Sequence, residues 1–98
     1  MNVASVFEFR FPTEVSEEGF GVARAIGADM PGETGYLDHS VIRDLQDPRR
    51  VLVITHWVDQ DHATAVLSHY ANDPKVRKAT ELIGQQPDGF VGEIDAKA

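Results

Sequence analysis

The chain has 98 residues, no cysteine and a formal net charge of −7 at pH 7. This length predicts one domain over residues 1–98 with a structured core over 3–95, and the lack of cysteine excludes disulfides, a thiolate nucleophile and cysteine metal sites. Basic residues do not cluster, no apolar run reaches the roughly 18 residues of a membrane span, and no signal-peptide pattern is visible, so we expect a cytoplasmic protein without nucleic-acid or membrane partners.

The first third of the sequence predicts a strand followed by a helix. Residues 3–11 alternate between two faces, which is typical of a strand, and Pro12 ends the alternation. Thr13 is the expected N-cap of the helix. Apolar residues at helical spacing predict the buried stripe of this helix: Val15, Val22 and Ile26. Residues 27–35 contain a proline-glycine turn signal and are expected to form a loop.

The middle of the sequence predicts a hairpin and a second helix. Residues 36–43 and about 50–58 are the expected strands, joined by a polar turn around Pro48. Asp59 is the expected N-cap of the helix that follows. The expected buried stripe of that helix comprises Ala63, Val66, Leu67, Tyr70 and Ala71.

The last third predicts a separate helix and a final strand. Asp73 caps this helix, Pro74 occupies its first position and Gly84 ends it. Its inward-facing residues are expected to be Val76, Ala79, Thr80 and Ile83. Residues 90–95 are the expected last strand, and residues 96–98 are expected to fray.

The predicted order is βαββαβ, with the second helix broken in two. This order is typical of a ferredoxin-like α+β fold, a four-stranded antiparallel sheet with helices on one face. The strands are apolar on both faces, for example at Val53 and at Ile54. A sheet that is apolar on both sides needs a second cover. We therefore expect a homodimer in which the uncovered sheet faces of two copies meet.

Four stretches resemble the antibiotic biosynthesis monooxygenase domain, a family of dimeric α+β barrel proteins. They are the Pro-Gly-x-x-Gly-Tyr-Leu segment at 31–37, the turn at 47–49, the Thr-His-Trp end of a strand at 55–57, and the helix end at 69–74. The resemblance implies the dimeric fold. It also implies a cavity between sheet and helices that holds small hydrophobic or aromatic molecules.

Only some of the family's functional residues are present at the matching positions of this chain. Quinone-forming members have a tryptophan at the end of the third strand, which matches Trp57. An asparagine of those members falls at Val53 in this chain, and a tyrosine falls at Val41.

Haem-degrading members resemble this chain around residues 55–57. Their first-strand asparagine falls at Ser5, and their iron-binding histidine falls near Ala79. Because that histidine is missing, haem is not expected as a cofactor.

The two central strands predict a candidate catalytic group on one face. His39 should lie opposite Thr55 across the hairpin, with Trp57 on the same face. His39 is then the candidate base, Trp57 the stacking wall and Thr55 the orienting group. The alternative is a core histidine bonded to Thr55, with Trp57 as packing. The expected substrate-binding residues are Ser5, Phe7, Phe9, Tyr36, Leu37, Val41, Val53, His69 and Tyr70.

Two other histidine arrangements are not expected to be metal sites. His62 and His69 are two helical turns apart, about 10 Å along the axis, which is too far for one metal ion. His56 should lie near Asp38 on the opposite strand face, where we interpret the pair as structural.

The resemblance, taken with the candidate base His39, therefore implies a cofactor-independent oxygenase of a small phenolic or quinol-like aromatic, with molecular oxygen as co-substrate. Three alternatives stay open. They are a haem-binding or haem-degrading protein, an isomerase that uses His39 as a proton shuttle, and a non-catalytic dimeric module that binds a small ligand.

Overall fold

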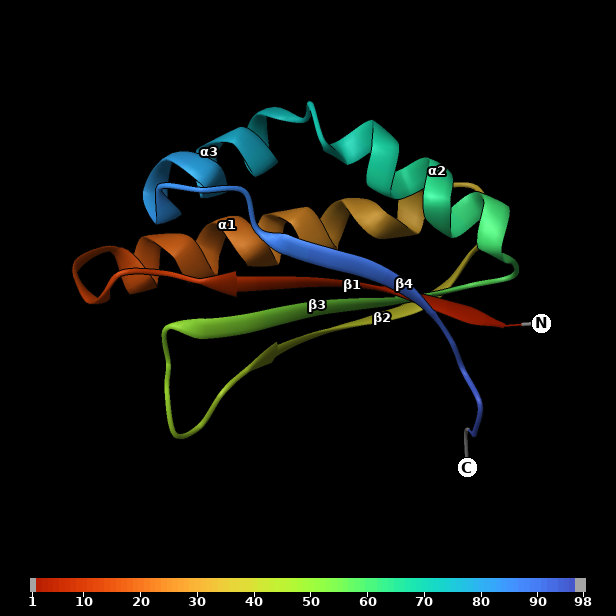
Figure 1. Ribbon diagram of the computed structural model, residues 1–98, viewed down its shortest axis with the longest axis horizontal. Helices are drawn as coiled ribbons and strands as arrows, with labels where there is room; N and C mark the ends of the chain where they lie inside the picture. Colours follow the sequence, from red (N-terminus) through yellow and green to blue (C-terminus); the bar gives the residue numbers. More distant parts are fainter. Residues whose placement is uncertain (1, 97–98) are drawn as a thin grey trace.

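A computed structural model of the chain describes residues 2–96. Figure 1 shows helices over one face of a four-stranded sheet, whose other face is uncovered. The elements in chain order are β1 (Val3–Arg10), η1 (Thr13–Val15), α1 (Ser16–Asp29), η2 (Met30–Gly32), β2 (Tyr36–Arg43), β3 (Arg50–Trp57), α2 (Gln60–Tyr70), α3 (Pro74–Ile83) and β4 (Asp88–Glu93).

The sheet has the order β2-β3-β1-β4, and all its pairings are antiparallel. This confirms the predicted ferredoxin-like α+β fold. β1 and β3 occupy the centre, and β2 and β4 form the edges. None of the helices within residues 2–96 is long and apolar enough to cross a bilayer.

Strict alternation on the central strands decides which face meets the helices. Every second residue of β1 and β3 is buried, whereas their neighbours are only partly buried or exposed. The buried set forms the floor of the core: Val3, Ser5, Phe7, Phe9, Val51, Val53, Thr55 and Trp57. A stack between Phe9 and Phe11, with ring centroids 5.8 Å apart, continues this core beyond the end of β1.

Helix α1 lies unusually close to its neighbours because glycines face them. A Cβ atom added at Gly19 would overlap the ring of Phe11. One added at Gly27 would lie 2.7 Å from Cγ2 of Val41 on β2. Both glycines are buried, and they let the helix backbone take the place that side chains would otherwise fill.

The predicted helix boundaries agree best with the structure where a capping residue is present. Asp59 and Asp73 cap α2 and α3 by accepting hydrogen bonds from backbone N–H groups, and Gly84 ends α3 with a φ of 89°. At α1 the prediction was wrong. Thr13 makes no capping bond and begins η1 instead, and α1 starts at Ser16.

Two further boundaries differ from expectation. The predicted loop over 27–35 is mostly helical, because α1 continues to Asp29 and η2 follows directly. The last strand begins at Asp88 and ends at Glu93, about two residues earlier than predicted. Residues 97–98 of the expected frayed tail lie outside the described residues.

Candidate functional site

The candidate base His39 lies on the helix-facing side of β2, directly opposite Thr55 of β3 as predicted. Its Nδ1 lies 2.8 Å from the hydroxyl oxygen of Tyr36, three residues earlier on the same strand. The ring of Tyr36 in turn meets Trp57 edge-on, with centroids 6.4 Å apart. These three side chains form a continuous aromatic group at one end of the hairpin.

An irregularity in β2 brings Tyr36 into this group. Regular pairing from His39 would place Leu37 opposite Trp57, but the register shifts between Tyr36 and Asp38, and Tyr36 takes that position. Leu37 is 43% exposed. Leu37 was expected among the substrate-binding residues, but the position opposite Trp57 belongs to Tyr36. The cause is local, since a bulge adds one residue and reverses the alternation before it.

The side chains around His39 differ in their exposure to solvent. Trp57 is fully buried and Thr55 is 1% exposed, whereas Tyr36 and His39 are half-buried. The indole N–H of Trp57 donates to the hydroxyl oxygen of Ser5 at 2.9 Å. Trp57 and Thr55 thus lie within the packed core behind Tyr36 and His39. Solvent reaches only the outer pair.

The remaining predicted binding residues are divided between core and surface. Phe7, Phe9 and Val53 are buried in the core, and Val41 packs against it. On α2, Tyr70 is buried and His69 is exposed. The rings of these two neighbours meet edge-on at 5.3 Å. The structure therefore brings Tyr36, His39, Thr55 and Trp57 together, and it does not place His69 among them.

Among the hollows on the described surface are five that His39, Thr55 and Trp57 do not line. One, of about 190 Å³, has Phe7 in its wall, together with residues of α2 and α3 and the segment before β4. Another, of about 280 Å³, lies between residues 33–34 and α2 and includes His69.

Burial controls the ionisation of Tyr70. Desolvation, followed by the nearby carboxylates of Asp29, Glu33 and Asp73, raises the pKa of the Tyr70 phenol far above its usual value. The hydroxyl therefore stays protonated at physiological pH and can donate a hydrogen bond to Asp29. Asp29 also pairs with Lys75 at 2.8 Å, which ties the end of α1 to the start of α3.

On the uncovered sheet face, His56 lies opposite Asp38 as predicted, with Nδ1 at 2.5 Å from a carboxylate oxygen. This pair lies on the opposite side of the sheet from His39. Within residues 2–96 there is no group of three or more histidine, aspartate or glutamate side chains placed to hold a metal ion.

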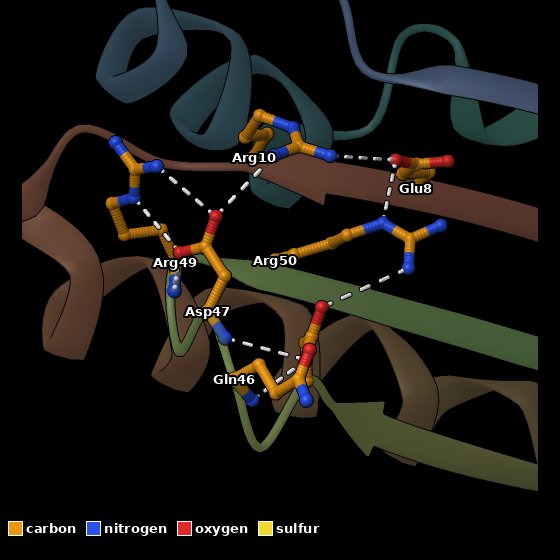
Figure 2. A network of polar contacts seen from close by, with 7 residues as sticks. Glu8, Arg10, Gln46, Asp47, Arg49 and Arg50 are labelled. Carbon is orange, nitrogen blue, oxygen red and sulfur yellow. Dashed lines mark hydrogen bonds and ion pairs between the residues drawn. The ribbon is translucent and has the colours of Figure 1, made fainter.

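A network of arginines and carboxylates holds the β2–β3 turn against β1, at the far end of the hairpin (Figure 2). Asp47 binds Arg49 through both carboxylate oxygens and accepts a further bond from Arg10 at 3.3 Å. The hydrogen bonds from Arg49 are the main cause that lowers the pKa of Asp47 from 3.8 to about 2. Sequence spacing had suggested only a polar turn here.

Comparisons with known proteins place this geometry in context. The family model described as antibiotic biosynthesis monooxygenase matches residues 3–81. Among proteins with curated descriptions, none matches this sequence.

Several solved structures share the fold. A mutant of SnoaB, a cofactor-independent oxygenase from Streptomyces nogalater, is 18% identical with a TM-score of 0.73, covering 98% of this chain and 95% of that one. A protein from Deinococcus radiodurans is 20% identical with a TM-score of 0.74 and the same coverage of each chain. A conserved protein from Methanosarcina mazei is 15% identical with a TM-score of 0.73, covering 93% and 90%.

Proposed function

The chain belongs to the antibiotic biosynthesis monooxygenase family, and from this premise we propose that it is a cofactor-independent oxygenase of a small phenolic or quinol-like aromatic compound. One oxygen atom of O₂ would be retained in a quinone product. The other would leave as water with two hydrogens of the substrate. The protein has to supply a base for the phenol proton and an apolar environment for the ring.

The observation that carries this proposal is the bond between Tyr36 and His39 on the helix-facing side of the sheet. Histidine is the side chain best suited to this role, because a neutral imidazole nitrogen can accept a phenol proton. Both residues are half-buried, so a substrate can approach them while much of the water is excluded. Loss of the proton leaves an electron-rich phenolate, which is the form that reacts with O₂.

The other predicted residues support this pair in the proposal. Trp57 packs behind Tyr36 and sets the angle of its ring, and Thr55 occupies the position across the strand from His39. The substrate ring would then lie against Tyr36 rather than directly on the fully buried Trp57. SnoaB, which has the same fold, is described as cofactor-independent, and this supports the absence of a cofactor in the proposal.

We further propose that the uncovered sheet face binds a second copy of the chain. Apolar side chains lie on this face, including Ile42 at 46% exposure and Phe90 at 60% exposure. Exposed large apolar side chains on one face mark an interaction surface. Polar and charged groups flank them, at the Asp38–His56 pair and in the network around Glu8 and Arg50, so a second copy can contact these groups reciprocally.

Labelled oxygen tests the oxygenase directly. A panel of single-ring phenols and quinols is incubated with the protein under ¹⁸O₂, and products are followed by mass spectrometry. Incorporation of one labelled atom, lost in His39→Ala with an unchanged circular dichroism spectrum, is the expected result. Turnover without oxygen would identify an isomerase instead. No turnover of any compound would favour a binding module and contradict the proposal.

A further inference from the structure

A second group of residues forms a hollow beside α2, on the outer side of the segment that precedes β2. The hollow has a volume of about 280 Å³ and is lined by Glu33, Thr34, His62, Ala65, Val66 and His69. Small-molecule sites begin at about 300 Å³, so this volume suits one substituted ring rather than a polycyclic compound. His62, Val66 and His69 recur at helical spacing, which places an imidazole at each end and an apolar residue between them.

The orientation of His62 is fixed by Asp59, the residue that caps α2. One carboxylate oxygen of Asp59 accepts the backbone N–H of His62 at 2.9 Å and lies 2.7 Å from Nδ1 of its ring. The backbone bond from His62, and then the ring bond, lower the pKa of Asp59, so the carboxylate is ionised at neutral pH. An ionised carboxylate only accepts hydrogen bonds, so Nδ1 must carry the hydrogen.

This bond leaves the other ring nitrogen, Nε2, as an acceptor in the neutral imidazole. No residue between 2 and 96 forms a hydrogen bond with it. Gly35 holds the ring in place, because its φ of 86° and missing side chain let the His62 ring lie against the backbone. A Cβ added there would be 2.6 Å from Cγ of His62. The acceptor is therefore preorganised before any ligand arrives.

Charge restricts what can bind. Glu33 is part of the wall, and the Asp59 carboxylate lies behind His62. The hollow is therefore bordered by two acidic side chains and by no lysine or arginine among the residues that line it. It disfavours carboxylates and phosphates and favours neutral or cationic hydrogen-bond donors.

We propose that this hollow binds a single-ring aromatic compound, neutral or cationic, whose hydroxyl group donates a hydrogen bond to Nε2 of His62. The floor for the ring is Val66, and His69 closes the far end. This site differs from the Tyr36–His39 pair and does not depend on turnover, so it can exist whether or not the protein is an oxygenase.

Proton NMR of the whole chain at about pH 7.5 tests the site, because the sequence has only four histidines, each with its own ring resonances. The probe is tyramine, which has a phenol and an ammonium group. We expect the His62 and His69 resonances to shift with a dissociation constant of about 1 mM. Phenethylamine, which lacks the hydroxyl, should bind about tenfold more weakly. The anion 4-hydroxybenzoate should also bind more weakly than tyramine.

Matched variants complete the test. Ala65→Leu fills the hollow and should abolish the tyramine shifts, whereas Thr64→Leu, at the exposed neighbouring position outside the wall, should leave them unchanged. Asp59→Asn keeps an efficient helix cap but no longer fixes the tautomer of His62, and should weaken binding.

Two outcomes would overturn the proposal. One is the absence of any His62 or His69 shift at saturating tyramine in the folded protein. The other is unchanged binding in Ala65→Leu. Shifts confined to His39 would reject this hollow and favour a ligand at the Tyr36–His39 pair, whereas failure of the ¹⁸O₂ experiment would leave the NMR result unaffected.

Discussion

The hydroxyl oxygen of Tyr36 lies 2.8 Å from Nδ1 of His39, and this bond decides which ring nitrogen of His39 can accept a proton. If Nδ1 donates to Tyr36, Nε2 is a free acceptor; if Tyr36 donates to Nδ1, Nε2 carries the hydrogen instead. Catalysis by Nε2 therefore requires the first arrangement. Exchange of the Tyr36–His39 pair between these two arrangements would set the fraction of protein molecules in which Nε2 can accept a proton.

Tyr36→Phe tests this dependence. The change removes the hydroxyl and keeps the ring that packs on Trp57, so the fold should persist. Turnover should fall and its pH profile should move, because the imidazole loses the partner that orients it. His39→Ala should cost about 10²–10⁴-fold, the usual contribution of a general base. An unaltered rate and pH profile in Tyr36→Phe would remove this bond from the mechanism.

Ser5→Ala should destabilise the protein without altering its surface. The indole N–H of Trp57 donates to Ser5 in the core, and the change leaves that donor buried without a partner. The expected loss is about 1–3 kcal/mol of unfolding free energy, measured by urea denaturation. Ser40→Ala, at an exposed position of β2, is the control and should have little effect. Equal effects of the two changes would argue against the bond.

Gly19→Ala and Gly21→Ala should have opposite effects on stability, although both lie in α1. A methyl group at Gly19 would overlap the Phe11 ring, whereas nothing lies within 4 Å of one at Gly21. Alanine is the better helix former by about 1 kcal/mol, so Gly21→Ala should stabilise the protein by up to that amount. Gly19→Ala should instead destabilise it by about 1–3 kcal/mol through overpacking. Thermal melting gives both signs, and stabilisation by Gly19→Ala would show that α1 is less closely packed than described.

Asp47→Asn should change how stability depends on acid. The folded state lowers the pKa of Asp47 from 3.8 to about 2, so the carboxylate stabilises the fold above the higher value. That contribution is lost as pH falls through the lower value. The difference in urea midpoint between the wild type and Asp47→Asn should therefore be largest near neutral pH and vanish towards pH 2. Glu81→Gln, an exposed acid on α3, is the control. A difference that does not vary with pH would contradict the assignment.

Phe90→Asp should convert a dimer into a monomer if the uncovered sheet face is the interface. Phe90 lies on that face and is 60% exposed, whereas Leu45 is 99% exposed in the β2–β3 turn. Light scattering at micromolar concentration should give a dimeric mass for the wild type and for Leu45→Asp, and a monomeric mass for Phe90→Asp. A monomeric wild type would reject the proposed interface.

Sequence patterns predicted the sheet better than the helices that cover it. The alternation of side chains between two faces predicted β1 and β3, because the same two-residue pattern repeats along each strand. The first helix was harder, since a loop was expected to begin at Gly27. In the structure this glycine is buried in α1 and allows close approach to Val41. A glycine that permits close packing and one that ends a helix have the same local sequence signature.

The candidate site was predicted only in part for a related reason. The position of His39 opposite Thr55 follows from strand register alone. The entry of Tyr36 into the group depends on a bulge, which the local sequence does not indicate. The expected space beside Trp57 is filled, because its side chain is fully buried, donates to Ser5 and meets the Tyr36 ring edge-on. Such filling is set by tertiary packing and has no periodic signal.

The burial of Trp57 also gives the chain a built-in optical probe. It is the single tryptophan of the sequence and is fully shielded from water. Its fluorescence should therefore be emitted at short wavelength in the native state and move to longer wavelength when the indole becomes hydrated. Because Tyr36 contacts its ring edge-on, the same emission should also respond to rearrangement of the hairpin end.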